Sequence, residues 1–329
     1  MSQAAALIRL RGRKTAHSQK GSIMRVFVAG ASGVLGRRLV PQLVARGHQV
    51  TATTTRADKL GMLRRLGADA VVMDGLDGAS VGEAVAAARP DALVHEMTGI
   101  AGKPDLKHPD RMFASTIRLR NEGTDHLLAA AAATGVPHVV AQSYGSWNGI
   151  RQGGWVKTES DPLDPETGTP MRSGAQAIEH LEAAVLAVGG AALRYGALYG
   201  PGATDDQVML LRKRQYPLVG SGNGYSSWVH LDDAAGATVL AVEQHATGVF
   251  NIVDDEPAPA REWLPYLAAC AGARPPMRIP VWLARLAAGE LPVVMMTQGR
   301  AFSNAKAKRE LGWQLRYPSW RQGFAAELS

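Results

Sequence analysis

The stretch VFVAGASGVLGRRLV, residues 26–40, constrains the fold more than any other part of the sequence. An apolar run that predicts a buried strand ends at Gly30, and a segment with helical spacing of apolar residues follows Gly36. Gly30 permits a tight turn, Gly33 lets a ligand approach the backbone, and Gly36 allows the helix to pack closely. The free amides at the helix start would face that ligand, so the stretch predicts a turn that binds the pyrophosphate of a dinucleotide.

After this turn, short β-rich runs alternate with helical segments. Strands are expected in RVFVAG, HQVTATTT, DAVVMD, DALVHEM, HVVAQS and AALRYG, with helices between them, including long ones over residues 111–134 and 171–188. Alternation at this spacing requires crossover connections and a parallel sheet. We therefore expect an α/β fold, a Rossmann-type doubly wound parallel sheet with helices on both faces and a small C-terminal α/β substrate lobe.

Composition divides the chain into three parts. Residues 1–23 carry five basic residues and no acid, and are expected to form a disordered basic leader. Residues 24–195 are expected to form the dinucleotide-binding core, and residues 196–329 to complete the sheet and form the lobe. Three segments rich in Gly, Pro and Trp would build most of that lobe, namely 144–170, 197–228 and 255–300.

Charge and cysteine content exclude several classes of protein. The net charge is +7, but the leader holds +5 of it, so the rest of the chain lacks the basic surface of a nucleic-acid-binding protein. A single cysteine, Cys270, cannot form an intrachain disulfide, and a cytoplasmic location is expected. No apolar run is long enough to span a membrane, and no cluster has metal-ligand spacing. We expect a small-molecule substrate as the partner.

The residues after the second strand bear on the choice of dinucleotide. Arg56 follows that strand where an acidic residue would bind the ribose of NAD, and Arg37 and Arg38 follow the third glycine. A guanidinium pairs well with a 2′-phosphate, so NADP is the expected cofactor, while Asp58 keeps NAD as an alternative. Asp74 could accept from the adenine amino group or cap the next turn.

The chain resembles the extended short-chain dehydrogenases/reductases, the NAD-dependent epimerase/dehydratase family. The stretches that carry the resemblance are the glycine turn, DALVHEMTG, NEGTDHLLAAA, LRYGALYGPG, WVHLDDAAGA, GVFNIVDDEP and SNAKAKRELGW. The resemblance covers about residues 24–325 and implies a nicotinamide cofactor. The residues expected to bind it are Gly30, Ser32, Gly33, Val34, Leu35, Gly36, Arg37, Arg56, Asp74, Gly75, Met97, Thr98, Gly99 and Leu198.

The family's Tyr-x-x-x-Lys pair has no counterpart in this sequence. Its two positions fall on Met171 and Ala175, and none of the seven tyrosines is followed by lysine four residues later. The proton donor is therefore expected to be non-standard. The candidates are Tyr144 supported by Ser143 or Gln142, then Lys157, or water, with Arg172 as a residue that could polarise a carbonyl without transferring a proton.

These features predict an atypical NADP-dependent oxidoreductase or epimerase-like enzyme acting on a small carbonyl or alcohol. Two alternatives stay open: a redox sensor that binds NADP without catalysis, and redox-neutral catalysis with a retained nucleotide. Trp147, Trp155, Trp228 and the pair Met295–Met296 suggest an apolar substrate pocket. The helices over 111–134 and 171–188 could form a homodimer.

Overall fold

The structure, a computed structural model, describes residues 22–99, 105–145, 151–164 and 172–328. Almost all of the predicted basic leader, residues 1–21, lies outside the described residues. So do Trp147 and Met171.

A seven-stranded sheet forms the centre of the molecule, and every pair of neighbouring strands in it is parallel. Its order is β12 (Gly248–Ile252), β7 (Ala191–Tyr195), β5 (Val139–Tyr144), β4 (Ala92–His95), β1 (Arg25–Ala29), β2 (Gln49–Thr54) and β3 (Asp69–Val72). The chain crosses from β3 back to β4 beside β1, which makes a switch point at the carboxyl ends of β1 and β4. The predicted doubly wound sheet is confirmed.

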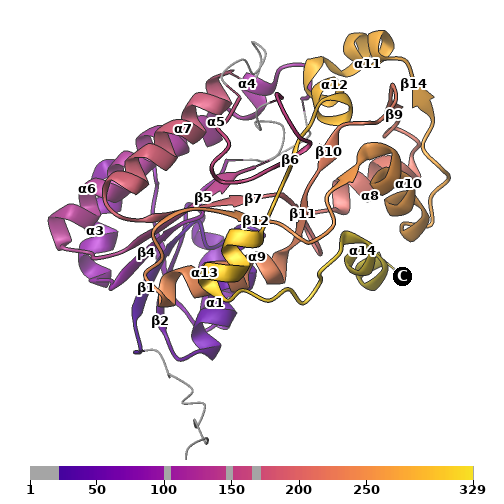
Figure 1. Cartoon of the computed structure of the whole chain (residues 1–329). Coiled ribbons are helices and arrows are strands. Elements are labelled where there is room, and N and C mark those ends of the chain that lie inside the picture. The colour runs from indigo at the N-terminus through magenta and orange to yellow at the C-terminus, as the bar shows by residue number, and fades with distance from the viewer. Residues whose placement is uncertain (1–21, 100–104, 146–150, 165–171, 329) are drawn as a thin grey trace, which may run out of the picture.

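Two layers of helices cover the sheet (Figure 1). On one face lie α1 (Gly36–Ala45), α2 (Leu60–Arg65), α9 (Leu231–Glu243) and α13 (Ala305–Leu311), and on the other α3 (Gly78–Ala88), α6 (Thr124–Thr134) and α7 (Arg172–Ala187). Each layer has its own apolar core. Leu39 and Leu43 of α1 are fully buried in the first, and Leu127 and Leu181 in the second.

The chain is helical where the sequence predicts a long helix, over residues 111–134, but it does not form one regular helix. It consists of α4 (Pro109–Met112), α5 (Ala114–Arg118), a π-helical segment (Leu119–Gly123) and α6. Phe113 adopts φ −98° and ψ 3° and ends α4. The π-helical segment then shifts the side chains that face the sheet, a change that apolar periodicity does not reveal.

The lobe is built from short strand pairs and five helices beside the carboxyl edge of the sheet (Figure 1). The helices are α8 (Asp205–Arg212), α10 (Ala260–Cys270), α11 (Val281–Ala288), α12 (Glu290–Thr297) and α14 (Trp320–Leu328). The pairs are β6 (Val156–Lys157) with β15 (Ala301–Phe302), β8 (Ala197–Tyr199) with β11 (Trp228–His230), β9 (Leu218–Val219) with β14 (Arg278–Ile279), and β10 (Tyr225–Ser226) with β13 (Ala258–Pro259). The boundary between the dinucleotide-binding core and the rest of the chain, at residue 195, stays a prediction.

None of the helices in the described part of the chain combines the length and the apolarity that a bilayer crossing requires.

Candidate functional site

The glycine turn lies where β1 ends, at the switch point of the sheet. Gly30 has φ +88°, and a Cβ atom there would lie 2.7 Å from the carbonyl oxygen of Glu96. The Gly30 amide donates to Oγ1 of Thr53 at 3.2 Å, which joins the turn to β2. Only glycine fits both the backbone angle and the space, so the tight turn is built as predicted.

The other two glycines serve different purposes. A Cβ at Gly36 would lie 2.5 Å from the carbonyl oxygen of Ala31, so this residue allows α1 to begin directly against the turn. Gly33 is exposed, and a Cβ there would meet only the Gly30 carbonyl oxygen, at 3.3 Å. The space over Gly33 is thus open to a ligand.

Backbone amides beside that space are available to an anion. Within the described residues, the N–H groups of Val34, Leu35 and Gly36 make no hydrogen bond to the protein. Three amides at a helix start, together with the helix dipole, suit a phosphate group. The turn therefore fits the pyrophosphate of a dinucleotide.

The residues expected at the adenosine end interact with one another in this structure. Arg56 and Asp58, the markers for NADP and NAD, form an exposed ion pair at 2.6 Å. This pair raises the pKa of Arg56 and lowers that of Asp58, chiefly through their hydrogen bond. Asp74 accepts from the Leu76 amide at 2.9 Å, so it caps a turn, which is one of its two predicted roles. Ser32 accepts from the Thr54 hydroxyl at 3.0 Å.

The remaining predicted cofactor residues lie on the neighbouring strand ends and in the lobe. A Cβ at Gly75 would lie 2.4 Å from Sδ of Met97, so the loop after β3 packs directly against the loop after β4. Gly99 donates its amide to Oγ1 of Thr116 at 3.0 Å, and Thr98 is exposed. Leu198, half-buried in β8, pairs with Val229 of β11.

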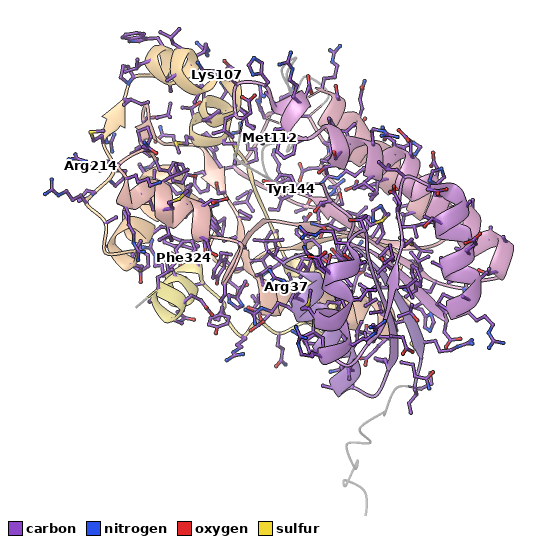
Figure 2. All side chains as sticks on the ribbon, turned by 180° about the vertical axis from the view of Figure 1, so that it is seen from behind. Arg37, Lys107, Met112, Tyr144, Arg214 and Phe324 are labelled. Atoms are coloured by element: carbon purple, nitrogen blue, oxygen red, sulfur yellow. The ribbon has the colours of Figure 1, made fainter. Side chains whose placement is uncertain are left out.

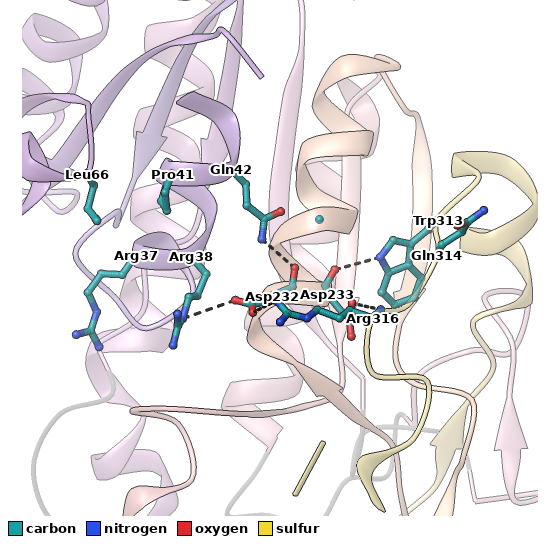
Figure 3. A pocket seen from close by; sticks show the side chains of 11 residues that line it. Arg37, Arg38, Pro41, Gln42, Leu66, Asp232, Asp233, Trp313, Gln314 and Arg316 are labelled. Carbon is teal, nitrogen blue, oxygen red and sulfur yellow. Dashed lines mark hydrogen bonds and ion pairs between the residues drawn. The ribbon is translucent and has the colours of Figure 1, made fainter. Parts of the chain in front are cut away.

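A hollow of about 650 Å³ lies next to the turn, between α1, α9 and the segment that follows α13. Arg37 and Arg38 form one wall, and Trp313 and Arg316 another (Figure 3). Arg38 and Arg316 both face Asp232, at 3.8 and 3.5 Å. Arg37 has no acidic partner in the described part of the chain, and its Nε donates to the Gly33 carbonyl at 3.4 Å.

At the carboxyl end of β5, Ser143 belongs to a buried ionic network. Its hydroxyl donates to Oε1 of Glu182 on α7 at 2.6 Å. The same carboxylate accepts two hydrogen bonds from Arg194 of β7, at 2.7 and 2.6 Å. The side chains of Arg194 and Glu182 are only 6% and 8% exposed. This network ties β5, β7 and α7 together, and the catalytic role of Ser143 stays a prediction.

Tyr144 lies beyond Ser143 in an apolar cluster. Met112 lies near it (Figure 2). The same cluster includes Phe113, together with Leu291 and Val294 of α12. Ala175, which stands at the expected lysine position, is 5% exposed and packs in the same cluster. The residue predicted to stand at the family's lysine position thus takes part in an apolar contact between α7 and α12.

Lys157 lies in the short ribbon of β6 and β15, where it pairs with Phe302. Its side chain is 3% exposed, and Nζ donates to the Gln152 carbonyl and lies 4.0 Å from Asp161. Glu159, on the same loop, accepts from the Asn251 amide at 2.8 Å and so fastens the loop to β12. Arg172 is exposed at the start of α7.

Glu96, directly after β4, is a buried carboxyl group beneath the turn. Its Oε1 accepts from the Tyr195 hydroxyl at 3.1 Å, and Tyr195 lies 2.6 Å from Oγ1 of Thr238. Burial raises the pKa of Glu96 from 4.5 to about 8. The Nδ1 atom of the neighbouring His95 accepts from the Met97 amide, and burial lowers the pKa of His95 to about 4. Both groups are uncharged at neutral pH.

Glu96 makes the stability of the protein depend on pH. The folded chain keeps this proton up to about pH 8, whereas the unfolded chain releases it near the ordinary value of 4.5. The free energy of unfolding should therefore fall as pH rises between these values. We expect Glu96→Gln to flatten this fall and to stabilise the protein at pH 9 by on the order of 2 kcal/mol.

Urea unfolding at pH 6 and pH 9 measures this effect. The control is Glu83→Gln, which changes an exposed carboxylate on α3. An equal loss of stability in the wild type and in Glu96→Gln would show that Glu96 is not the group responsible.

Comparisons with known proteins agree with this geometry. The sequence pattern of the NAD dependent epimerase/dehydratase family matches residues 26–253. A 3-diazoavenalumate denitrifying reductase from a Streptomyces species is 42% identical over 311 residues, which cover 92% of this chain and 100% of the relative. A 2-alkyl-3-oxoalkanoate reductase from Stenotrophomonas maltophilia is 29% identical over 267 residues, 76% of each protein.

Solved structures share the same fold. Human epimerase family protein SDR39U1 with NADPH has a TM-score of 0.72 and 21% identity, over 93% of this chain and 99% of the human one. The UDP-glucose 4-epimerase of Thermus thermophilus with NAD has a TM-score of 0.70 and 23% identity, over 93% and 98%.

Proposed function

Because this chain belongs to the NAD dependent epimerase/dehydratase family, we propose that it is a nicotinamide-dependent reductase whose acceptor carries an aryl diazonium group that leaves as dinitrogen. The reductases and epimerases among its relatives support the coarser statement, an oxidoreductase or epimerase with a nicotinamide cofactor. The finer proposal draws on the 42% identical relative, which is named as a denitrifying reductase of a diazo compound.

The observation that carries the proposal is the apolar environment of Ala175. A carbonyl acceptor becomes an alkoxide, which needs a proton donor such as the family's tyrosine with its lysine. When bound, NADPH supplies a hydride, and with a diazonium acceptor the products are the C–H compound, dinitrogen and NADP⁺, with no proton consumed. A site that takes this acceptor needs no lysine to assist a proton donor. An alanine at position 175, packed against Leu291 and Val294, is consistent with such a site.

The side chains of the apolar cluster around Tyr144 also suit such an acceptor. Met112, Phe113 and Tyr144 offer a polarisable and aromatic surface, which favours a flat aromatic body. Apolar side chains around a reacting group exclude water, which would otherwise replace the leaving group by hydroxyl. We propose that these side chains orient the acceptor and exclude water from it.

For the cofactor itself, we propose that the amides of Val34, Leu35 and Gly36 bind the pyrophosphate across Gly33. NADP is favoured over NAD because Arg37 has no acidic partner in the described residues and lies beside the turn. Arg56 would also bind the 2′-phosphate of NADP once its ion pair with Asp58 breaks. That ion pair is exposed, so breaking it costs little free energy.

A second candidate is carbonyl reduction with Tyr144 as the proton donor. Two observations favour it: the position of Tyr144 at the end of β5, and the similarity to 2-alkyl-3-oxoalkanoate reductase. Its phenol would donate directly to the developing alkoxide, while Ser143 stays bonded to Glu182.

Tyr144→Phe separates the two candidates. With NADPH and benzenediazonium, we expect the variant to keep its rate within about threefold, because this acceptor takes no proton. Reduction of ketones by the wild type, at a rate that falls by about a hundredfold in Tyr144→Phe, would favour carbonyl reduction instead. The measurement is the rate of NADPH oxidation, followed by the absorbance of the reduced nicotinamide ring and corrected for the rate without protein. Tight NADPH binding without turnover of either acceptor would favour the redox sensor.

A further inference from the structure

Two segments of the lobe, residues 207–231 and 263–289, contain basic residues and no acidic one. Their basic residues, all exposed, are Arg212, Lys213, Arg214, Arg274, Arg278 and Arg285. Figure 2 shows one of them, Arg214, projecting from the edge of the molecule. The net charge is +7 and residues 1–23 hold +5 of it, so the residues outside these segments and after residue 23 together carry net negative charge. Positive charge is therefore concentrated in the two segments.

The fold brings both segments to the side of the lobe that faces away from the seven-stranded sheet (Figure 1). Arg212, the last residue of α8, donates from Nε to the carbonyl oxygen of the residue that follows α10, at 3.0 Å. Strand β9 pairs with β14, and a Cβ added at Gly220 would lie 2.9 Å from the side chain of Val281, the first residue of α11. We call the exposed residues of 209–215 and 274–286 the lobe end.

Apolar side chains are exposed among the bases of the lobe end. Trp282 and Leu286 are 66% and 70% exposed, and they stand four residues apart on one face of α11. Met277, before α11, and Met209, on α8, are also exposed. Exposed apolar side chains that gather on one surface indicate an interaction site. The lobe end therefore suits a partner that is both apolar and negatively charged.

Most of the positive charge of the lobe end is uncompensated. Arg285 pairs with Glu290 at 2.5 Å, and in the described part of the chain the other five bases make no ion pair. Glu262 directly precedes the second segment. Its carboxylate lies 3.5 Å from Arg321 and 3.9 Å from Arg261, two bases outside the lobe end. An anionic partner would supply the missing counter-charge.

The combination of bases and apolar side chains selects among possible partners. In a two-fold dimer the same surface meets itself, so the unpaired guanidinium groups of two copies would face one another. A nucleic acid offers phosphates but gives Trp282 and Leu286 no apolar layer to enter. An anionic bilayer offers charged headgroups to the bases and the edge of the acyl region to the apolar side chains.

We propose that the lobe end is an interaction surface that rests on an anionic phospholipid bilayer. Trp282 and Leu286 enter the boundary between headgroups and acyl chains, and Arg274 and Arg278 lie among the headgroups. This association is peripheral and requires no helix that crosses the bilayer. It is independent of the cofactor and of the reaction proposed above.

Vesicles with brominated acyl chains test this proposal on the full chain. Bromine quenches a tryptophan that lies at the acyl chains, and residues 1–23 contain no tryptophan, so binding through that basic segment alone gives no quenching. We expect vesicles of equal parts phosphatidylcholine and phosphatidylserine to bind at least about tenfold more tightly than phosphatidylcholine alone, and to quench the wild type. Trp282→Phe should bind as tightly but lose most of the quenching.

Charge and apolar contact are then removed separately. The double variant Arg274→Gln/Arg278→Gln should weaken binding to the anionic vesicles by at least about tenfold, and Leu286→Ser by about fivefold.

Each variant has a matched control elsewhere in the molecule. Arg64→Gln/Arg65→Gln removes two exposed bases from α2, and Leu186→Ser removes an exposed leucine from α7. Both controls should leave binding within about twofold of the wild type.

Three results would overturn the proposal: no preference for anionic vesicles, binding without quenching of the wild type, or equal losses in the lobe-end variants and their controls. Light scattering without vesicles tests the second copy, because a dimer that Leu286→Ser dissociates would assign the surface to self-association instead. Binding to double-stranded DNA that Arg274→Gln/Arg278→Gln weakens, with no binding to vesicles, would assign it to nucleic acid.

Discussion

A Gly33→Val variant is expected to keep its fold and to bind NADPH at least about a hundredfold more weakly than the wild type. Gly33 is exposed, its φ is not in the left-handed region, and an added Cβ would meet only one atom, at 3.3 Å. The folded chain therefore tolerates the change. The valine would occupy the space over the amides of Val34, Leu35 and Gly36, which is where a pyrophosphate would have to lie.

Calorimetric titration with NADPH and a thermal unfolding curve together measure this effect. Gly82→Val on α3 is the control, since a Cβ there meets nothing within 4 Å and the site is remote from the turn. An unchanged Kd in Gly33→Val would contradict the assignment of the turn. Gly36→Val, by contrast, should unfold the chain, because its Cβ would collide with the Ala31 carbonyl oxygen.

The second large effect is expected from Glu182→Ala, which should lower the free energy of unfolding by about 3–5 kcal/mol. The alanine leaves the Arg194 guanidinium buried without a counter-charge and the Ser143 hydroxyl without its acceptor.

Urea unfolding at neutral pH tests this expectation. Glu179→Ala removes an exposed carboxylate from the same helix and should change stability by less than about 0.5 kcal/mol. A similar small loss in Glu182→Ala would show that the network is not what holds β5, β7 and α7 together.

The fold could be predicted because its determinants are local. Apolar runs of strand length alternate with helical segments, and a turn that only glycine can form stands at Gly30. The interruption of the helix over 111–134 could not be predicted in this way. A π-helical turn changes the hydrogen-bond pattern without changing the apolar spacing that identifies a helix.

The site was harder to predict because its groups meet through distant parts of the chain. Glu182 on α7 binds Ser143 and Arg194 from different strands, and no local pattern indicates that contact. Arg56 and Asp58 could each be named as markers of the cofactor, but their pairing with each other emerged only in three dimensions.

The central claim is a reduction that releases dinitrogen, and the most direct measurement follows the nitrogen. The wild type is mixed with NADPH and benzenediazonium carrying ¹⁵N at both positions, with Gly33→Val as the blank, and the gas is analysed by mass spectrometry. We predict one molecule of ¹⁵N₂ and one of benzene for each NADPH oxidised, above the blank. NADPH oxidation with the label retained in phenylhydrazine, or ¹⁵N₂ release without NADPH oxidation, would contradict the account.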